Sequence, residues 1–224
     1  MSERSIDERS APAQARRGRP GYDRAQVLSV AVQLFNEQGY DATSVSDLAT
    51  RLGLSKSALY HHFDSREQLL EVALDSALSA LEAVLDEPDA HSGSASNRLR
   101  HVIRGAVGVL VDHLPSVTLL LRVRGNSTVE IAALTRRRVF DHRVTELVEA
   151  AQKDGGVRQD IDARVVTRLI FGMINSIVEW YRPDRGVDRD ELTHDVLAVA
   201  IDGIESRGTG VDELISREVQ GHDG

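Results

Sequence analysis

The chain has 224 residues, of which 41% are hydrophobic and 28% are charged, and its formal net charge is −8. This length is enough for one large or two modest domains with a buried core. The absence of cysteine excludes disulfides, a thiolate nucleophile and cysteine-ligated metals. No apolar run approaches the ~20 residues of a membrane span, and the polar N-terminus has no signal-peptide core, so we expect a cytoplasmic protein.

The charge is distributed unevenly along the chain. Residues 1–63 hold 8 Lys/Arg and 7 Asp/Glu, a net of +1, so the remaining residues, with 19 against 28, carry −9. An acidic body with a near-neutral head, in which basic residues stand at chosen points, suits a specific nucleic-acid regulator better than a nonspecific coating protein.

Residues 1–21 are polar and contain prolines and glycines, so we expect a flexible basic N-terminal arm. Within this arm stands the basic segment Arg16-Arg17-Gly18-Arg19-Pro20. Arginines of such a segment can enter a narrow minor groove, where the negative potential of DNA is strong. The segment directly precedes the first predicted helix. This position favours DNA contacts by Arg16, Arg17 and Arg19 over a merely solvated basic tail.

The stretch from 44 to 63 predicts two short helices joined by a glycine turn. Apolar residues recur at helical spacing after Ser44, a candidate N-cap, and Gly53 stands where a left-handed residue ends a helix. In the second helix, Leu59 and Phe63 are four residues apart and point inward. The outward face near its N-terminus, where a recognition helix meets bases and phosphates, consists of Lys56, Ser57, Tyr60 and His61. The pattern predicts a helix-turn-helix reader of DNA, with an ordinary helical hairpin as the alternative because such patterns are degenerate.

The flanking sequence favours the DNA reader. An amphipathic helix precedes it, with Asp23 and Gln26 as a capping box, and another helix opens after Asp64. Characteristic pairs and runs stand at fixed spacing: Leu34-Phe35, Gly39-Tyr40, Ala42-Thr43-Ser44-Val45, Leu48-Ala49, Leu59-Tyr60-His61-His62-Phe63 and Ser65-Arg66-Glu67-Gln68-Leu69-Leu70. Through these residues, about 22–72 resembles the DNA-binding domain of TetR-type transcriptional regulators.

The resemblance implies which residues contact DNA. Thr43 and Ser44 match phosphate-contacting positions, and Arg66 matches the basic residue at the start of the following helix, which is usually Lys. The base-reading first turn and the phosphate or base-edge positions after it correspond to Lys56, Ser57, Ala58, Tyr60, His61 and His62. The resemblance also implies a palindromic operator of double-stranded DNA, read by a homodimer.

Apolar periodicity predicts further helices over 65–86, 97–113, 115–123, 128–152, 162–181 and 189–205. No strand-like alternation and no internal repeat are present, so the expected fold is all-α with about nine helices. We expect a helix-turn-helix domain over 22–68, a helical ligand-binding and dimerisation domain over 69–206, and a flexible tail over 207–224. The last two helices carry more apolar surface than one buried side needs, and the resembled family dimerises there, so we expect a homodimer through 162–205.

The resembled family holds its effector in a pocket between the central helices of the body, and the ligand moves the two reading heads apart. Candidate pocket residues are Arg122, Phe140, Phe171, Asn175 and Trp180. Packing in a core or an interface is the competing interpretation for Phe171 and Trp180. Asn175 is more informative, because an amide within an apolar helix must find a polar partner.

The segment 180–183 resembles regulators of lipid, sterol and aromatic catabolism that sense acyl-CoA thioesters. Phosphates of such an effector would then meet Arg122, Arg124 or the run 136–138, although an arginine run is more often a solvated helix face. The function expected is a homodimeric repressor that a small molecule releases from its operator. The alternatives are an efflux-type regulator of hydrophobic drugs, against which the 4% aromatic content argues, and an all-α interaction or enzyme module that binds no DNA.

Catalytic and metal chemistry are not expected. The sequence has no phosphate-binding glycine loop of the P-loop or dinucleotide type. His61 and His62 are adjacent on a helix and point about 100° apart, so they do not chelate one metal well together. We therefore predict no enzyme activity, no catalytic residue, no metal site and no cofactor.

Overall fold

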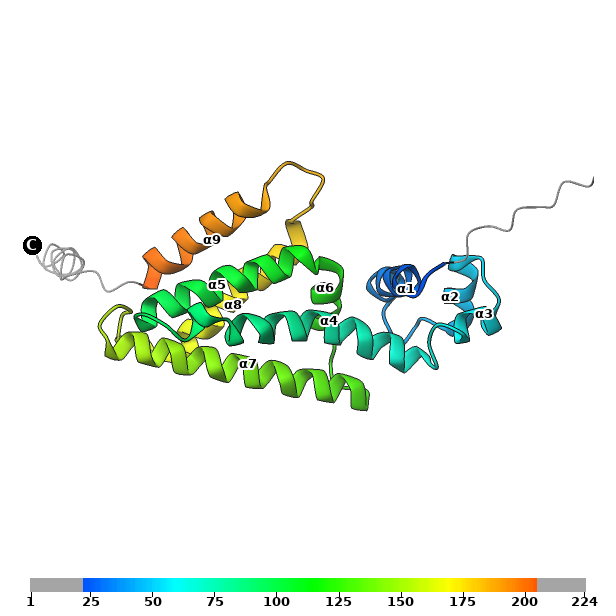
Figure 1. The fold of residues 1–224 in the computed structure, drawn as a ribbon, viewed down its shortest axis with the longest axis horizontal. Helices are drawn as coiled ribbons and strands as arrows, with labels where there is room; N and C mark the ends of the chain where they lie inside the picture. Colours follow the sequence, from blue (N-terminus) through cyan, green and yellow to red (C-terminus); the bar gives the residue numbers. More distant parts are fainter. Residues whose placement is uncertain (1–21, 205–224) are drawn as a thin grey trace, which may run out of the picture.

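The computed structural model describes residues 22–204, and within that range the chain is all-α (Figure 1). Three short helices form an N-terminal head: α1 (Arg24–Gln38), α2 (Val45–Leu52) and α3 (Lys56–Tyr60). The head lies at one end of the long axis, and α4 (Arg66–Asp86) runs from it into the body (Figure 1). The predicted arm with Arg16, Arg17 and Arg19, and the predicted tail over 207–224, lie outside the described residues.

Local sequence signals start α1 and α2, and end α2, where they were predicted. Asp23 and Gln26 bond reciprocally in a capping box at the start of α1, and Ser44 and Asp47 form a second one at the start of α2. Gly53 ends α2 with φ of 64°, in the left-handed region that disfavours a residue with a Cβ. These caps satisfy backbone groups that a helix end leaves unpaired.

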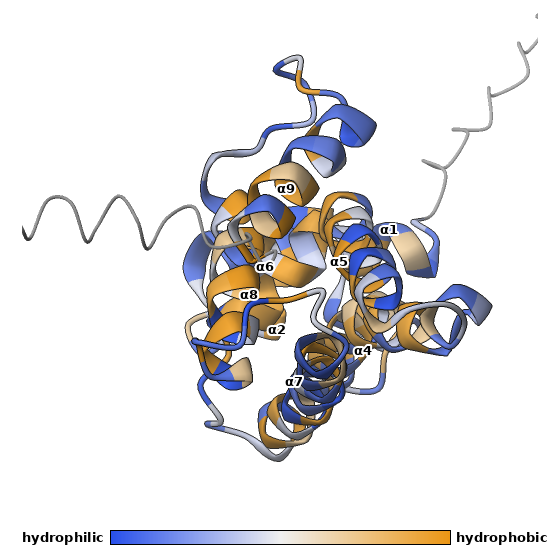
Figure 2. Cartoon of the chain, turned by 90° about the vertical axis from the view of Figure 1, so that its left-hand side faces the viewer, coloured by the Kyte–Doolittle hydropathy of each residue, from blue (hydrophilic) through white to orange (hydrophobic). Residues whose placement is uncertain are grey.

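The body consists of one 3₁₀ turn and five further helices: η1 (Pro88–Ala90), α5 (Ala95–Asp112), α6 (Leu114–Arg122), α7 (Thr128–Lys153), α8 (Ala163–Trp180) and α9 (Arg189–Ile204). The helices α4, α5, α7 and α8 pack around a shared apolar core, with α9 against α5 and with α6 against both α1 and α4. In Figure 2 the helix segments that face one another are coloured mostly as apolar, and α8 has apolar colour along much of its visible length. One continuous hydrophobic cluster therefore extends from the head into the body.

Two helix boundaries differ from the predictions by two or three residues. The second helix of the reader ends at Tyr60 instead of Phe63, and a turn carries the chain through His61 and His62. The predicted loop over 87–96 contains η1, and α5 begins at Ala95 because Ser94 caps it. The predicted domain boundary after residue 68 falls inside α4, so one helix belongs to both head and body.

Within the part of the chain that the structure describes, no single helix has the length and apolarity to cross a membrane. Only α5 and α6 taken together reach that length and composition, and they are bent by 100°.

Candidate DNA interface and effector site

The surface of α3 has the predicted arrangement. The Ser55 hydroxyl accepts a hydrogen bond from the Ala58 amide at 3.1 Å and so caps the helix, while Leu59 and Phe63 are buried beneath it. All four residues expected to face outward are exposed: Lys56, Ser57, Tyr60 and His61. The Tyr60 side chain is 50% exposed. Helix α3 and the turn after it thus present an ammonium group, two hydroxyls and an imidazole on a rigid base, and none of these four side chains is a carboxylate.

Two expected contacts are not on that surface. The Thr43 side chain is fully buried, and its hydroxyl donates to the Gly39 carbonyl at 2.8 Å, so this hydroxyl is engaged within the head. Arg66 is half-buried, donates to the carbonyls of Tyr40 (3.1 Å) and Thr43 (2.8 Å), and lies 4.3 Å over the Tyr40 ring. Both side chains fix the turn between α1 and α2, where Ser44 remains exposed.

Arg24 is a head residue that sequence reasoning missed. Its Nε donates to the His62 carbonyl at 3.3 Å, and its guanidinium lies 4.6 Å over the Phe63 ring, so it holds the end of α3 against α1. The sequence does contain a signal, because a cation at the first position of a helix opposes the helix dipole and calls for another role. His62 is half-buried and Ala58 is partly covered, which leaves them less accessible than the four residues named above.

A small apolar cavity lies in the body between α4, α5, α6, α7 and α8, with a volume of about 40 Å³. Three of the candidate pocket residues, Phe140, Phe171 and Asn175, line it, and the two phenyl rings meet edge to face with centroids 5.5 Å apart. Trp180 does not line it: this side chain is 54% exposed beyond the end of the cavity and packs on Tyr181.

Arg122 does not line the cavity either, because it connects the body to the head. Its Nη1 donates to the Asn36 carbonyl at the end of α1 at 2.7 Å, while the Asn36 amide donates to the Pro115 carbonyl at 2.8 Å. A third bond runs from Asn126 Nδ2 to Asp41 Oδ2 at 3.2 Å. The start and the end of α6, and the loop after it, are therefore hydrogen-bonded to the head.

An open groove of about 420 Å³ adjoins the cavity between α7 and α8. Four arginines line it: Arg137, Arg138, Arg164 and Arg168. The two spaces share Arg137, Asp141, Phe171 and Asn175, so an apolar compartment lies directly beside a cationic one. Sequence reasoning missed Arg164 and Arg168, although their four-residue spacing places them on one side of α8.

Two polar side chains, Asp141 and Asn175, lie at the junction where the cavity and the groove share their lining. Burial raises the pKa of the Asp141 carboxyl above its ordinary value, and the nearby Arg137 and Arg168 charges oppose this rise. Asn175 stands at the same junction, and within the described residues its amide makes no side-chain hydrogen bond. The junction thus contains an uncommitted amide beside a half-buried carboxylate.

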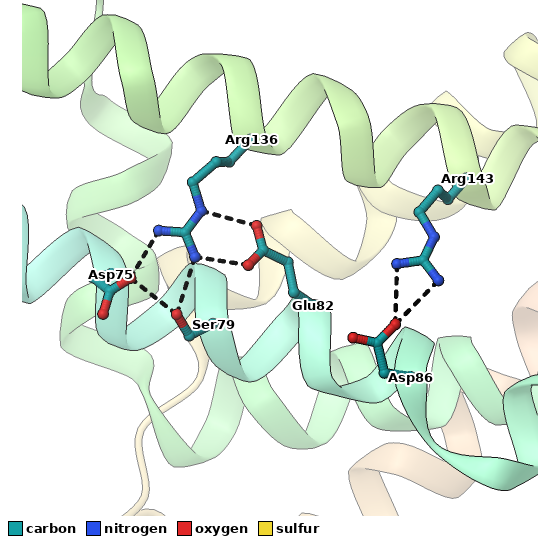
Figure 3. Close-up of polar contacts among 6 residues, drawn as sticks. All are labelled: Asp75, Ser79, Glu82, Asp86, Arg136 and Arg143. Atoms are coloured by element: carbon teal, nitrogen blue, oxygen red, sulfur yellow. Dashed lines mark hydrogen bonds and ion pairs between the residues drawn. The ribbon is translucent and has the colours of Figure 1, made fainter.

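Arg136 faces away from the groove, toward α4 (Figure 3). It bonds Glu82 through Nε (2.9 Å) and Nη2 (2.7 Å), Asp75 through Nη1 (2.8 Å), and the Ser79 hydroxyl through Nη2 (3.0 Å). The hydrogen bond from Arg136 lowers the pKa of Asp75, and the hydrogen bonds to Glu82 raise the pKa of Arg136. We call this set the Arg136 clamp; it binds α7 to α4, and these partners occupy the Arg136 guanidinium without a ligand phosphate.

Glu130 anchors the start of α7. Its buried carboxylate accepts the backbone amides of Arg124, Gly125 and Asn126 at 2.9, 2.7 and 3.1 Å, which accounts for this buried charge structurally. Arg124 therefore lies in the loop that this carboxylate organises, and it lines neither the cavity nor the groove. No cluster of three or more metal-ligating side chains occurs among residues 22–204.

Comparison with known proteins agrees with this geometry. Residues 27–73 match the family described as bacterial regulatory proteins, tetR family, and residues 92–204 match the tetracyclin repressor-like, C-terminal domain. The HTH-type transcriptional repressor KstR2 of Rhodococcus jostii (strain RHA1) is 30% identical over 199 residues, covering 87% of this chain and 97% of that protein. The fatty acid metabolism regulator protein of Bacillus subtilis (strain 168) is 24% identical over 197 residues, covering 84% and 98%.

A solved structure agrees as well. SCO3833, a member of the TetR transcriptional regulator family from Streptomyces coelicolor A3, is 50% identical, with a TM-score of 0.76 over 80% of this chain and 91% of that one. The chain belongs to the TetR family of transcriptional regulators. The predicted all-α fold and helix-turn-helix are confirmed, and the family is one of DNA-binding transcriptional regulators.

Proposed function

We propose that this protein is a homodimeric repressor that reads a palindromic operator and is released from it by an acyl-CoA thioester. One observation carries the effector assignment: the apolar cavity lies beside a groove lined by four arginines and shares four lining residues with it. An acyl group suits the cavity, and phosphates suit arginines, which bind them in a bidentate manner. The relation to a fatty acid metabolism regulator supports the same ligand class.

The proposed DNA contacts come from α3 and from the start of α2. Lys56, Ser57, Tyr60 and His61 are exposed together, and Ser44 is exposed at the N-terminus of α2. A helix N-terminus attracts phosphate because its amides and its dipole both favour an anion. Ala58 and His62 contribute at the edge of this face, and the predicted arm would add minor-groove contacts.

Lys56 allows a quantitative test, because the chain contains a matched control. Its two lysines are Lys56, at the start of α3, and Lys153, at the far end of α7. Each phosphate neutralised contributes about 0.9 to the slope of log affinity against log salt, so Lys56→Ala should make the slope of a dimer shallower by about 1.8. Lys153→Ala should leave it unchanged in titrations of an operator selected from random duplexes. Equal slopes for both variants and the wild type would remove Lys56 from the phosphate contacts.

Unpaired apolar surface supports the proposed dimer. The buried side of α8 includes Ile170, Ile174 and Ile177, yet Leu169 on its other side is 64% exposed. On α9, Val199 is 65% exposed. Apolar surface of this kind, on two neighbouring helices, is typical of an interface between protomers. Leu169→Glu should yield a monomer by light scattering; a dimer of unchanged stability would place the interface elsewhere.

A second copy also sets the spacing of the reading heads. Recognition helices must lie about 34 Å apart to enter successive major grooves, so a small change in the direction of α4 is enough to misalign them. The effector compartments are lined by α7, and the Arg136 clamp ties α7 to α4. We infer that effector binding redirects α4 through this connection.

The effector assignment is tested with hexanoyl-CoA as probe. Replacing Arg164 and Arg168 together by alanine should weaken its binding at least tenfold by calorimetry, because two phosphate-binding cations are lost. Arg185→Ala, a loop arginine that does not line either compartment, is the control. Operator release by an uncharged hydrophobic compound, together with no response to any thioester, would favour the drug-sensing alternative.

A further inference from the structure

Asp141 has an unusual position in the proposed effector site. It is the one carboxylate among the described residues that line the two compartments, and it lines both of them. Within the described part of the chain its carboxylate accepts no hydrogen bond; its backbone carbonyl accepts the Thr145 hydroxyl at 2.9 Å. A half-buried carboxylate without a direct donor costs stability, and such groups concentrate at functional sites.

The groups around Asp141 show what a ligand would meet there. The cations of the groove come from α7 (Arg137 and Arg138) and α8 (Arg164 and Arg168), with His142 beside them. The walls of the cavity beyond Asp141 are apolar except for Asn175 and Arg137. A ligand that extends from groove to cavity therefore passes from the cationic compartment across one negative charge into an apolar space.

We propose that Asp141 makes the site selective for thioesters over free carboxylic acids. This inference rests on the proposed function, since it concerns which acyl compound that site accepts. With the acyl chain in the cavity, the first acyl carbon lies at the junction, beside Asp141 and Asn175. A free acid brings a second negative charge to that point, whereas the thioester brings a neutral carbonyl and keeps its charges on phosphates farther out.

Asn175 contributes to binding and not to discrimination. Its uncommitted amide can donate to the carbonyl oxygen of a thioester, which is an acceptor without a formal charge. The same amide could donate to a carboxylate, so it does not separate the two ligands. Selection against the acid therefore falls to Asp141, and like-charge repulsion at such a partly desolvated position is worth about tenfold in affinity or more.

The test compares hexanoyl-CoA, hexanoate and CoA itself as probes by calorimetry on the full chain. Asp141→Asn removes the charge and keeps the shape, so it should tighten hexanoate binding about tenfold. The change in CoA affinity in Asp141→Asn measures the general increase that follows from removing a negative charge near the arginines. The increase in hexanoate affinity should be several-fold larger than the increase in CoA affinity. Asp154→Asn, an exposed position after the end of α7, is the matched control and should change none of the three. Thermal melting verifies that both variants are folded.

Three results would overturn the inference. The first is an unchanged ratio of hexanoyl-CoA to hexanoate affinity in Asp141→Asn, with thioester binding intact; the proposed function would then survive. The second is a wild type that binds the acid as tightly as the thioester. The third is a wild type that binds neither probe while retaining its operator, in which case the proposed effector class falls together with this inference.

Discussion

The Arg136 clamp makes the proposed connection between effector and DNA testable. Arg136→Met removes the guanidinium but keeps an unbranched apolar stem and good helix propensity. The change breaks two ion pairs, to Asp75 and Glu82, and one hydrogen bond to Ser79. Arg136 is about one-third exposed, so solvent weakens these interactions. At about 0.2–1 kcal/mol for each exposed pair, the free energy of unfolding should fall by about 1–2 kcal/mol.

The functional effect follows from where the clamp lies. Arg137, the next residue on α7, lines both effector compartments, while Asp75 and Glu82 lie on the helix that carries the head. Coupling between an effector and a distant site is typically about 1–3 kcal/mol, or roughly 5–150-fold in affinity. Loss of the clamp should remove most of that factor. Operator affinity without effector, and effector affinity without DNA, should change only a few-fold.

The assay is fluorescence anisotropy of a labelled operator duplex with and without saturating hexanoyl-CoA. Arg143→Met is the matched control, because Arg143 also joins α7 to α4 but contacts Asp86, the last residue of α4 and the farthest from the head (Figure 3). That variant should retain the effector response. A destabilised Arg136→Met protein with a full response would show that the clamp is only structural. An equal loss in Arg143→Met would assign the coupling to helix adhesion in general.

Three further outcomes are expected from local geometry. Gly53→Ala should destabilise by about 1–2 kcal/mol in urea unfolding, because φ is 64° and no neighbour lies within 4 Å, so backbone strain alone acts; an unchanged midpoint would contradict this. Glu130→Gln should cost about 1.5–3 kcal/mol, since one oxygen of this carboxylate accepts three amides, and a neutral result would mean that the charge contributes nothing. Asp75 has a lowered pKa, so its contribution is complete above its ordinary value of 3.8 and is lost as pH falls through the lower value of the folded state. The stability difference between wild type and Arg136→Met should therefore shrink in acid, and a pH-independent difference would refute the assignment.

Features that depend on a few adjacent residues could be predicted from the sequence. The caps at Asp23 and Ser44 and the left-handed Gly53 are local, because a side chain and a backbone amide three residues away meet wherever the helix packs. The exposed face of α3 was also predictable, since Leu59 and Phe63 fix which side is buried. Its shorter length was not, because the turn after Tyr60 depends on Arg24 from another helix.

Features that depend on which helices become neighbours could not be predicted. Helical periodicity shows that successive arginines at 136–138 point about 100° apart around the helix axis. It does not show which neighbouring helix each of them faces. Packing of α7 between α4 and α8 decides that Arg136 binds α4 while Arg137 and Arg138 line the groove. The same reason explains why the positions of Arg122 and Trp180 could not be predicted. A polar or aromatic residue near a helix end does not show from the sequence how far it lies from a cavity. Threonine at position 43 is a residue type suited to phosphate, yet its hydroxyl donates to the backbone carbonyl of Gly39, four residues earlier.

The size of the cavity places a physical demand on release. At about 40 Å³ it has room for only a few water-sized groups, so an acyl chain of any length must displace the helices that line it. The helices available to move are tied to the head, because α7 is bonded to α4 through the Arg136 clamp and α6 is bonded to α1 through Arg122. Interiors are close-packed, so displacement of α6 or α7 is transmitted to these contacts and not absorbed as local expansion. Filling the cavity and holding the head in its effector-free position are therefore in direct competition, which is what effector-dependent release of DNA requires.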